Sequence, residues 1–363
     1  ASMVLVVFTF RGVSTYLHTI IMAKVGQSIV ADIQKDEQGY ITKLVLEDGT
    51  EHEADLFCDA TGFNRILTGT MDNGWHDYEH IFTRDAIVGP VKYKDVYNEM
   101  RPYTQSYAQD HGWNFIIPLF NRMGSGYIFY TNSEDPDVAR EKFIKYWDGY
   151  DFIRDPRQLK WDQGYYKDGW VNNVVGVGMG QGFIDPMEAN SIYVAQSCIE
   201  MLDKAITKYE GREIPTKAKK GYGRHIQKLE NQISDFISYH FTLSKRRDNP
   251  MWQKAGNIGA EHNHVEKNWH DYRAARGYLG RNIFLDYQWA QQQHYLDRWD
   301  DKLCQLNIDP KLLPLADVDF NYIRNKGKAL SKYLPHIYDW SRDRLHNGAS
   351  HEEVLQQALA DRK

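Results

Sequence analysis

The 363-residue sequence has few cysteines, and the ones it has form no pattern. Cys58, Cys198 and Cys304 are odd in number, and neither disulfide nor metal-ligand spacing relates them. Such a set is typical of a reducing compartment and argues against a structural zinc site. We therefore expect a cytoplasmic protein without a bound metal.

Long hydrophobic runs and blocks of like charge are also missing. The apolar run Met3 to Phe8 is far shorter than the roughly 20 residues of a bilayer-spanning helix, and no basic region precedes it as in a signal peptide. The 44 basic and 49 acidic residues leave a net charge of −5. We expect neither a membrane nor a nucleic acid as a partner.

The sequence does contain enough apolar residues to build a sizeable core. Hydrophobic residues make up 42% and charged residues 26%, as in globular proteins, and the length suggests about two domains. Aromatic residues are in excess, with 24 Tyr, 15 Phe and 10 Trp. They suit planar ligands, but packing in the core is the simpler interpretation.

Strand patterns dominate the first part of the chain. Three short apolar segments separated by turn residues predict a β-meander: Gln27 to Gln34, Ile41 to Leu46 and Asp55 to Asp59. Further along, Phe115 to Phe120 and Tyr127 to Tyr130 flank a glycine-containing turn, which predicts a hairpin.

Helical periodicity begins at Pro136, where Asp135 precedes Ala139, Phe143 and Trp147. A buried strand is expected over Val174 to Val177. Apolar residues at helical spacing then predict two long helices, Ser191 to Ala205 and Tyr222 to Phe241.

A run of alternating glycines, Gly176 to Gly182, follows that buried strand. Its spacing differs from the G-x-G-x-x-G of dinucleotide-binding loops, but small residues here allow close backbone approach. The next helix offers free N–H groups to an anion. Between them stand two carboxylates, Asp185 and Glu188; helix capping by Asp185, Asn190 or Ser191 is the simpler alternative to catalysis.

Four segments in order resemble motifs of the flavin-dependent tryptophan halogenases. Residues 173–192 (NVVGVGMGQGFIDPMEANSI) are similar to G-F-x-x-P-L-E-S-T-G-I, and 55–63 (DLFCDATGF) to D-L-F-x-D-x-[ST]-G-F. Residues 101–119 are similar to P-Y-T…G-W-x-W-x-I-P-L, and 239–252 to H-Y-x-L…R-x-D-x-P-F-W. Each match is modest alone, but four in the same order make chance implausible.

The resemblance implies an α+β, FAD-dependent monooxygenase/halogenase-like fold with a β-meander, mixed sheets and a helical C-terminal subdomain. Residues 1–200 would form the FAD-binding core, incomplete at its N-terminus, and 201–363 a mostly helical substrate-binding subdomain. The family's pyrophosphate-binding G-x-G-x-x-G and catalytic lysine precede the meander, and Arg11 to Val13 is not that fingerprint. Lys24 reads as a surface lysine rather than the catalytic one.

The activity implied is FADH2- and O2-dependent halogenation of an indole or phenol-like arene through hypohalous acid. A separate flavin reductase would supply reduced FAD, and a halide ion would be consumed; a homo-oligomer is compatible with the sequence. Two alternatives stay open. One is a flavin monooxygenase that hydroxylates its substrate, and the other is a noncatalytic flavin-fold remnant that serves as a binding module.

By the same resemblance, Glu188 is the active-site carboxylate that orients the electrophile and takes the proton from the arenium intermediate. The halide would sit on the backbone amides of Asn190 and Ser191, where the family usually has Thr-Gly. Loss of the glycine restricts φ and adds bulk, so the halide preference is expected to differ from the usual one.

The flavin contacts implied are Val30, Met179 and Ile192. Trp113 and Phe115 take the places of a tryptophan pair that walls the substrate off from the flavin, although two core aromatics alternating on a strand are an equal alternative. The substrate itself is not identified, because the C-terminal aromatics read at least as well as a helix-packing set: Trp269, Tyr272, Tyr278, Trp289, Tyr295 and Trp299.

Overall fold

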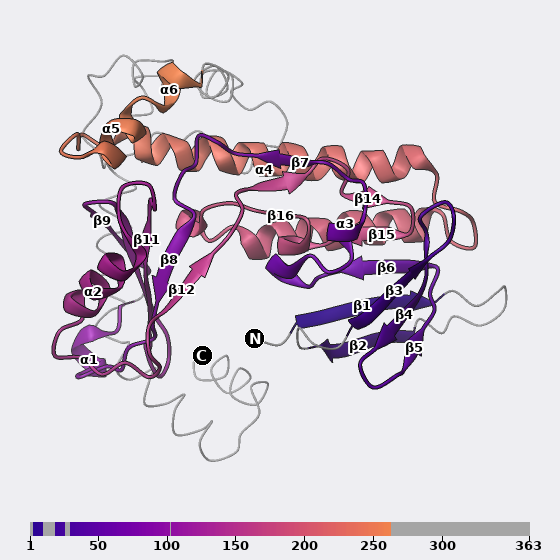
Figure 1. Ribbon diagram of the computed structural model, residues 1–363, viewed down its shortest axis with the longest axis horizontal. Coiled ribbons are helices and arrows are strands. Elements are labelled where there is room, and N and C mark those ends of the chain that lie inside the picture. Colours follow the sequence, from indigo (N-terminus) through magenta and orange to yellow (C-terminus); the bar gives the residue numbers. More distant parts are fainter. Residues whose placement is uncertain (1–2, 10–18, 26–29, 102, 263–363) are drawn as a thin grey trace, which may run out of the picture. The chain divides into compact units, whose positions relative to one another are not determined.

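The computed structural model describes residues 3–9, 19–25, 30–101 and 103–262. Within these ranges the chain forms two compact units, which are considered separately. The first contains the described residues up to 84 together with 161–244 and 255–262, and the second contains 85–160 and 245–254. Figure 1 shows the helices and strands of both.

The first unit is organised around a five-stranded sheet of order β14-β15-β6-β1-β2. Its strands are Trp170–Val171 (β14), Val174–Gly176 (β15), Leu56–Asp59 (β6), Met3–Thr9 (β1) and Thr19–Val25 (β2). Strands β6 and β15 run parallel, with Cys58 opposite Val175, and both are buried. The expected strand over Val174 to Val177 is thereby confirmed, one residue shorter.

The expected meander forms, but its third strand was assigned wrongly. The three-stranded antiparallel sheet is Val30–Lys35 (β3), Ile41–Leu46 (β4) and Glu51–His52 (β5). The segment expected as its third strand becomes β6 in the large sheet. All four β6 residues are buried, as in a strand covered on both faces, whereas four of the six β3 residues are exposed and none is fully buried. Phe57 joins the two sheets in one core with Ile41, Leu44, Leu67 and Val174.

A further small sheet and two long helices complete the first unit. The sheet has the order β16-β13-β7, formed by Gly182–Phe183, Gly164–Tyr166 and Trp75–Asp77. The helices are Ser191–Lys208 (α3) and Thr216–Leu243 (α4), which confirm and extend the two expected helices. They lie side by side (Figure 1), and the apolar face of α4 is buried through most of its length. The other short elements are 3₁₀ turns at Gly62–Asn64 (η1), Thr68–Thr70 (η2), Gly178–Gly180 (η3) and Pro186–Glu188 (η4), with α6 at Ile258–Glu261.

The second unit is an antiparallel sheet of order β12-β8-β11-β10-β9 with α2 against it. The expected hairpin is confirmed as Gly112–Pro118 (β10) and Met123–Phe129 (β11), and the expected helix as Pro136–Tyr146 (α2). Asp135 begins α2 by accepting from the Asp137 N–H. The remaining elements are Gln105–Gln109 (β9), Asp85–Val88 (β8), Arg157–Lys160 (β12) and Val96–Glu99 (α1); Pro250–Gly256 forms α5.

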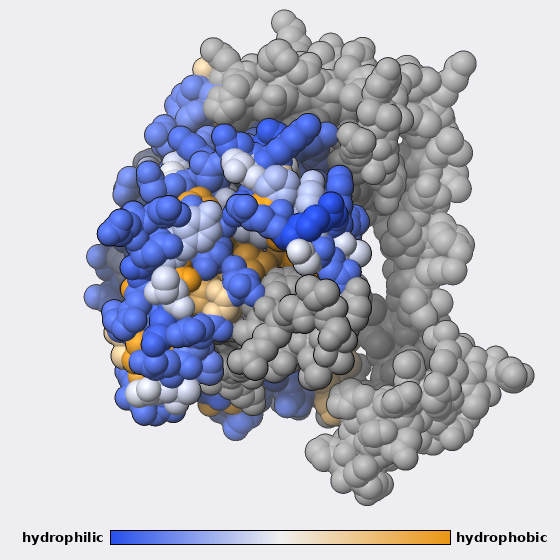
Figure 2. All heavy atoms as spheres, turned by 90° about the vertical axis from the view of Figure 1, so that its right-hand side faces the viewer, coloured by the Kyte–Doolittle hydropathy of each residue, from blue (hydrophilic) through white to orange (hydrophobic). Residues whose placement is uncertain are grey.

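The described residues present a mainly polar surface. Among the coloured residues of Figure 2, hydrophilic side chains dominate, and apolar ones gather toward the middle of the view. Among the described residues, every helix is too short or too polar to cross a membrane.

Candidate active site

Three of the predicted site residues, Glu188, Asn190 and Ser191, lie on one tight connection between β16 and α3. Asp185 begins the turn η4 by accepting from the Met187 N–H at 3.0 Å, and it also accepts from the Thr83 hydroxyl. Asp185 is thus a capping residue, which was the simpler alternative to a catalytic role for it. Ala189 ends η4 with φ of 52°, and its N–H donates to the Pro186 carbonyl. This left-handed residue separates Glu188 from the start of α3.

Glu188, the predicted catalytic carboxylate, contacts a histidine on α4. Its Oε1 lies 2.8 Å from Nε2 of His240, and both side chains are partly exposed. The other ring nitrogen, Nδ1, lies 3.0 Å from the Phe236 carbonyl, one turn earlier in α4. The imidazole is therefore held at both nitrogens.

The two contacts fix the orientation of the imidazole. Each has a distance typical of a hydrogen bond, one to the backbone of α4 itself and one to the carboxylate of η4. His240 thereby orients the Glu188 side chain from α4.

Asn190 and Ser191 stand at the first turn of α3, an 18-residue helix whose N-terminal N–H groups favour an anion. Asn190 occupies the N-cap position, yet its side chain accepts no hydrogen bond from the helix. Its Nδ2 is buried without a hydrogen-bond partner among the described residues. Capping by the Asn190 side chain, one of the alternatives, is thus not what the structure shows.

An apolar cavity of about 580 Å³ opens beside the same turn. Two of the three predicted flavin contacts, Met179 and Ile192, line it, whereas Val30 lies on β3 and is not one of its lining residues. The other lining residues come from β6, η1, η3, α3 and the loop positions 60 and 177 next to them: Cys58, Ala60, Gly62, Val177, Gly178, Ser191, Ala195, Gln196, Ile199 and Leu202.

The buried carboxylate of Asp59 shapes one wall of this cavity. Its Oδ1 accepts from the Thr61 N–H and hydroxyl, and its Oδ2 accepts from the Leu67 and Thr68 N–H groups and the Thr68 hydroxyl. These bonds fold residues 60–68 into a compact loop directly after β6. Ala60 and Gly62, which line the cavity, are positioned by that loop.

Trp113 and Phe115 lie in the second unit, two residues apart on β10. Their ring centroids are 6.1 Å apart at 55°, and Trp113 is 3% exposed. Phe115 packs over Gly126 of β11, where an added Cβ would come within 2.6 Å of its ring. Both alternatives for Trp113 and Phe115, a wall between substrate and flavin or a pair of core aromatics, stay predictions.

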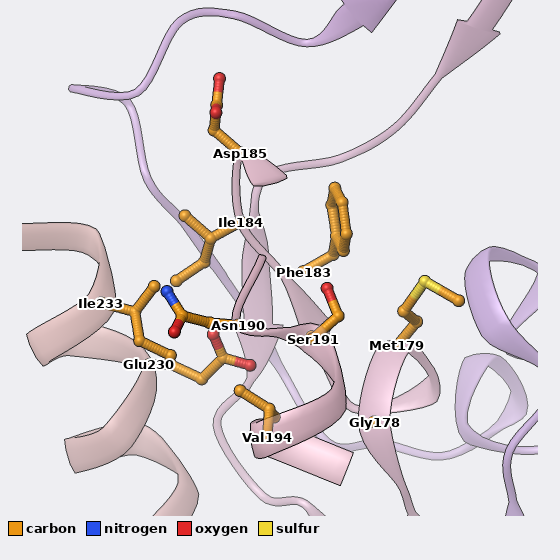
Figure 3. Close-up of a pocket in the computed structure, with 11 residues that line it drawn as sticks. Gly178, Met179, Phe183, Ile184, Asp185, Asn190, Ser191, Val194, Glu230 and Ile233 are labelled. Atoms are coloured by element: carbon orange, nitrogen blue, oxygen red, sulfur yellow. The ribbon is translucent and has the colours of Figure 1, made fainter. Parts of the chain in front are cut away.

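Two side chains of α4 that reach the candidate site were not predicted from the sequence. His240 meets Glu188, and Glu230 reaches the start of α3, where Figure 3 draws it beside Asn190 and Val194. Both stand four residues after an apolar position of the helix face, Ile226 for Glu230 and Phe236 for His240. An ionisable residue on an apolar helix face was the available signal. The side chain of Lys24 and the aromatics from Trp269 to Trp299 lie outside what the structure describes.

Comparison with known proteins assigns the chain to a family. The sequence model named tryptophan halogenase matches residues 19–294. The chain belongs to the tryptophan halogenase family. Tryptophan 6-halogenase ThaL of Streptomyces albogriseolus is 27% identical over 346 residues, which is 88% of this chain and 63% of ThaL. Tryptophan 7-halogenase KtzQ of Kutzneria sp. is 28% identical over 342 residues, or 89% of this chain and 63% of KtzQ.

Solved structures of tryptophan halogenases agree. The tryptophan C-6 flavin-dependent halogenase Tar14, from taromycin biosynthesis, superposes with a TM-score of 0.68 at 25% identity, covering 84% of this chain and 61% of Tar14. The resemblance read from four motifs is confirmed, as is a mixed α/β fold shared with flavin-dependent halogenases. The chain spans less than two thirds of the length of these relatives.

Proposed function

We propose that this chain carries the halogenating site of a flavin-dependent enzyme that acts on an electron-rich arene of the indole or phenol kind. One short connection, from Asp185 to Ser191, supports the proposal. It places the paired carboxylate of Glu188, the first N–H groups of α3 and one edge of an apolar cavity next to one another in the chain. The relatives ThaL and KtzQ carry the names of tryptophan halogenases.

The cavity suits a flavin ring. Ligand sites for planar molecules span roughly 300 to 1,000 Å³ and are mainly apolar, and this cavity measures about 580 Å³. Met179 and Ile192 would hold the ring system, with Val30 as a further contact. When bound as FADH2, which a separate reductase supplies, the cofactor with O2 provides the oxidising power that turns halide into hypohalous acid.

Glu188 is proposed to orient the electrophile and to take the ring proton. Halogenation forms a carbon–halogen bond as the halogen–oxygen bond of the hypohalous acid breaks and releases hydroxide, which becomes water. The C–H electron pair then returns to the ring as the proton leaves for the carboxylate. A negative charge next to the ring stabilises the cationic intermediate more than the neutral arene. His240 keeps that carboxylate oriented.

The remaining roles are part of the same proposal. Asn190 and Ser191 would bind the halide, and Trp113 with Phe115 would wall the arene off from the flavin. The division into an FAD-binding part, residues 1–200, and a mostly helical substrate-binding part, 201–363, is proposed as well, and so is a cytoplasmic location.

The test is turnover of the full chain with FAD, an NADH-dependent flavin reductase, O2 and bromide, using a panel of indoles and phenols. Mass spectrometry should detect a brominated arene, and Glu188→Gln should lower the rate at least ~100-fold, the size of a lost general base. Glu200→Gln is the matched control, because Glu200 is 71% exposed on α3.

Other products would change the assignment. Gain of oxygen without dependence on bromide would indicate a hydroxylase. Absence of any brominated product, together with identical behaviour of Glu188→Gln, would refute the halogenase. Failure to bind flavin in a titration would indicate a noncatalytic binding module.

A further inference from the structure

A second, much smaller cavity lies between α4 and the start of α3. Its walls include Gly182 of β16, Asn190 and Ser191 at the helix start, and Glu230 and Ile233 of α4 (Figure 3). Its volume is about 10 Å³, so one water molecule is the largest species that it can hold. Gly182 leaves that room, because an added Cβ there would lie 3.0 Å from Glu230 Oε1.

Two polar atoms reach this cavity without a hydrogen-bond partner among the described residues. One is Oε1 of Glu230, whose side chain is buried, and the other is the buried Nδ2 of Asn190, so the two atoms do not bond to each other. Asp185 lines the same cavity, but its oxygens accept from the Met187 N–H and the Thr83 hydroxyl. Buried polar atoms are almost always paired, and one water between Glu230 and Asn190 would satisfy both.

Glu230 is mainly neutral at pH 7. Burial raises the pKa of its carboxyl to about 8, and Arg65 offsets the effect only in part. The side chain therefore sets no full negative charge beside the start of α3. A neutral carboxyl can accept from a water molecule or donate to it, and the same water can accept from Nδ2 of Asn190.

Asn190 stands where an asparagine ordinarily caps a helix. The side-chain oxygen of an N-cap residue usually accepts from the N–H of the second or third helical residue, here Ile192 or Tyr193. Asn190 makes no such bond with α3, and Figure 3 draws its side chain beside the carboxyl group of Glu230. The first N–H groups of α3 thus stay free of this cap and available to an anion.

We infer that Glu230 is a positioning residue, which holds the Asn190 side chain in the small cavity through one bound water and so keeps it from capping α3. The inference rests on the proposed function, which places an anion at those N–H groups. A capping asparagine would compete with the anion for the same donors. A side-chain cap of ordinary strength corresponds to a ~5-fold loss of apparent anion affinity.

The structural test is a crystal structure of the full chain at pH 7, without flavin or arene. Wild type should show one water within hydrogen-bond distance of both Glu230 Oε1 and Asn190 Nδ2. Glu230→Leu removes both carboxyl oxygens, and the Asn190 oxygen should then accept from the N–H of Ile192 or Tyr193. Glu230→Gln keeps one oxygen and should retain the water.

The kinetic test varies bromide at pH 7. Glu230→Leu should raise the KM for bromide ~5-fold with kcat unchanged within about twofold, whereas Glu230→Gln should stay within about twofold of wild type in both. In an Asn190→Ala background, Glu230→Leu should have no further effect on KM, because no side chain is left to cap the helix. Glu200→Gln is the control, since Glu200 is 71% exposed on α3. Circular dichroism verifies that each variant is folded.

Three results would overturn the inference. One is a wild-type crystal structure without a water that contacts both side chains, a measurement that does not depend on the variants folding. The second is an Asn190 side chain that caps α3 in wild type. The third is a bromide KM of Glu230→Leu equal to that of wild type. A chain that shows the bridging water but yields no brominated arene would refute the proposed function alone.

Discussion

The buried acid Glu230 should make the stability of this protein fall as the pH rises, and replacing it should remove that fall. The perturbation is Glu230→Gln, which conserves volume and one hydrogen-bonding oxygen. In the folded chain, burial raises the pKa of Glu230 from its ordinary 4.5 to about 8. Between these two values the folded state holds a proton that the unfolded state has released, so unfolding becomes easier with increasing pH.

The magnitude follows from the width of that window. A pKa raised by about 3.5, at roughly 1.4 kcal/mol for each pH unit, corresponds to a loss on the order of 5 kcal/mol between pH 4.5 and 8. The loss is absent below pH 4.5 and complete above pH 8. Glu230→Gln has no such group, so the stability difference between variant and wild type should grow by several kcal/mol across this window.

The assay is urea unfolding at pH 5, 6.5 and 8, followed by the circular dichroism of the helices. Glu200→Gln, exposed on α3, should show a difference from wild type that is flat with pH. A flat difference for Glu230→Gln as well would refute the reasoning, because it would mean that Glu230 is ionised in the folded protein and paired with a cation.

Two further predictions concern the groups that hold the site. His240→Gln should lower turnover ~10- to 100-fold with little change in the KM for the arene, since the flexible glutamine holds Glu188 less rigidly than the imidazole does. Steady-state kinetics with mass-spectrometric detection measures the split, and an unchanged kcat would contradict the positioning role of His240. Asp59→Asn replaces one acceptor oxygen by an amide N–H₂ group, which then faces the N–H donors of residues 61–68. Urea unfolding should show a loss of stability of about 3 kcal/mol, and flavin binding should weaken. Stability equal to that of wild type would show that the loop does not depend on the carboxylate.

Local patterns were sufficient to predict much of the fold. Helical spacing of apolar residues located α3 and α4, and Asp135 before Pro136 marked the start of α2. The hairpin of β10 and β11 followed from its turn residues. In each case the residues that decide the element lie within one turn or one strand of each other, so the sequence carries the information directly.

The pairing of strands could not be read in the same way. Leu56–Asp59 looks like the third strand of a meander, but in the large sheet it pairs with Met3–Thr9 on one side and with Val174–Gly176, more than a hundred residues away, on the other. Pairing over such a distance depends on which apolar surfaces meet in three dimensions. The burial of all four residues of β6, which distinguishes the two arrangements, is a property of the folded chain.

The candidate site was predicted where motif residues are contiguous and missed where distant residues complete it. Glu188, Asn190 and Ser191 share one connection: Glu188 ends the turn η4, and Asn190 and Ser191 stand at the start of α3, where the sequence predicts a helix to begin. His240 and Glu230 come from α4 and reach this connection because the two helices pack together. The motif thus predicted the residues that lie on the connection, and the packing of α4 against α3 brings the α4 side chains to them.

The left-handed residue Ala189 provides a final test of how the connection works. Alanine in this conformation costs roughly 1 to 2 kcal/mol, and glycine removes that strain but loses about 0.5 to 1 kcal/mol to chain entropy. Ala189→Gly, at φ of 52°, should therefore stabilise the chain by at most about 1.5 kcal/mol.

Ala189→Val should behave differently, because a β-branched side chain is strongly disfavoured at positive φ. The connection would relax toward an extended backbone and move Glu188 away from His240, which lies 2.8 Å from it. We expect a loss of about 1 to 3 kcal/mol in urea unfolding and a fall in turnover that the glycine variant does not share. A valine variant as active and stable as the glycine one would show that the Glu188–His240 contact survives without the left-handed turn, and the turn would then have no part in positioning the carboxylate.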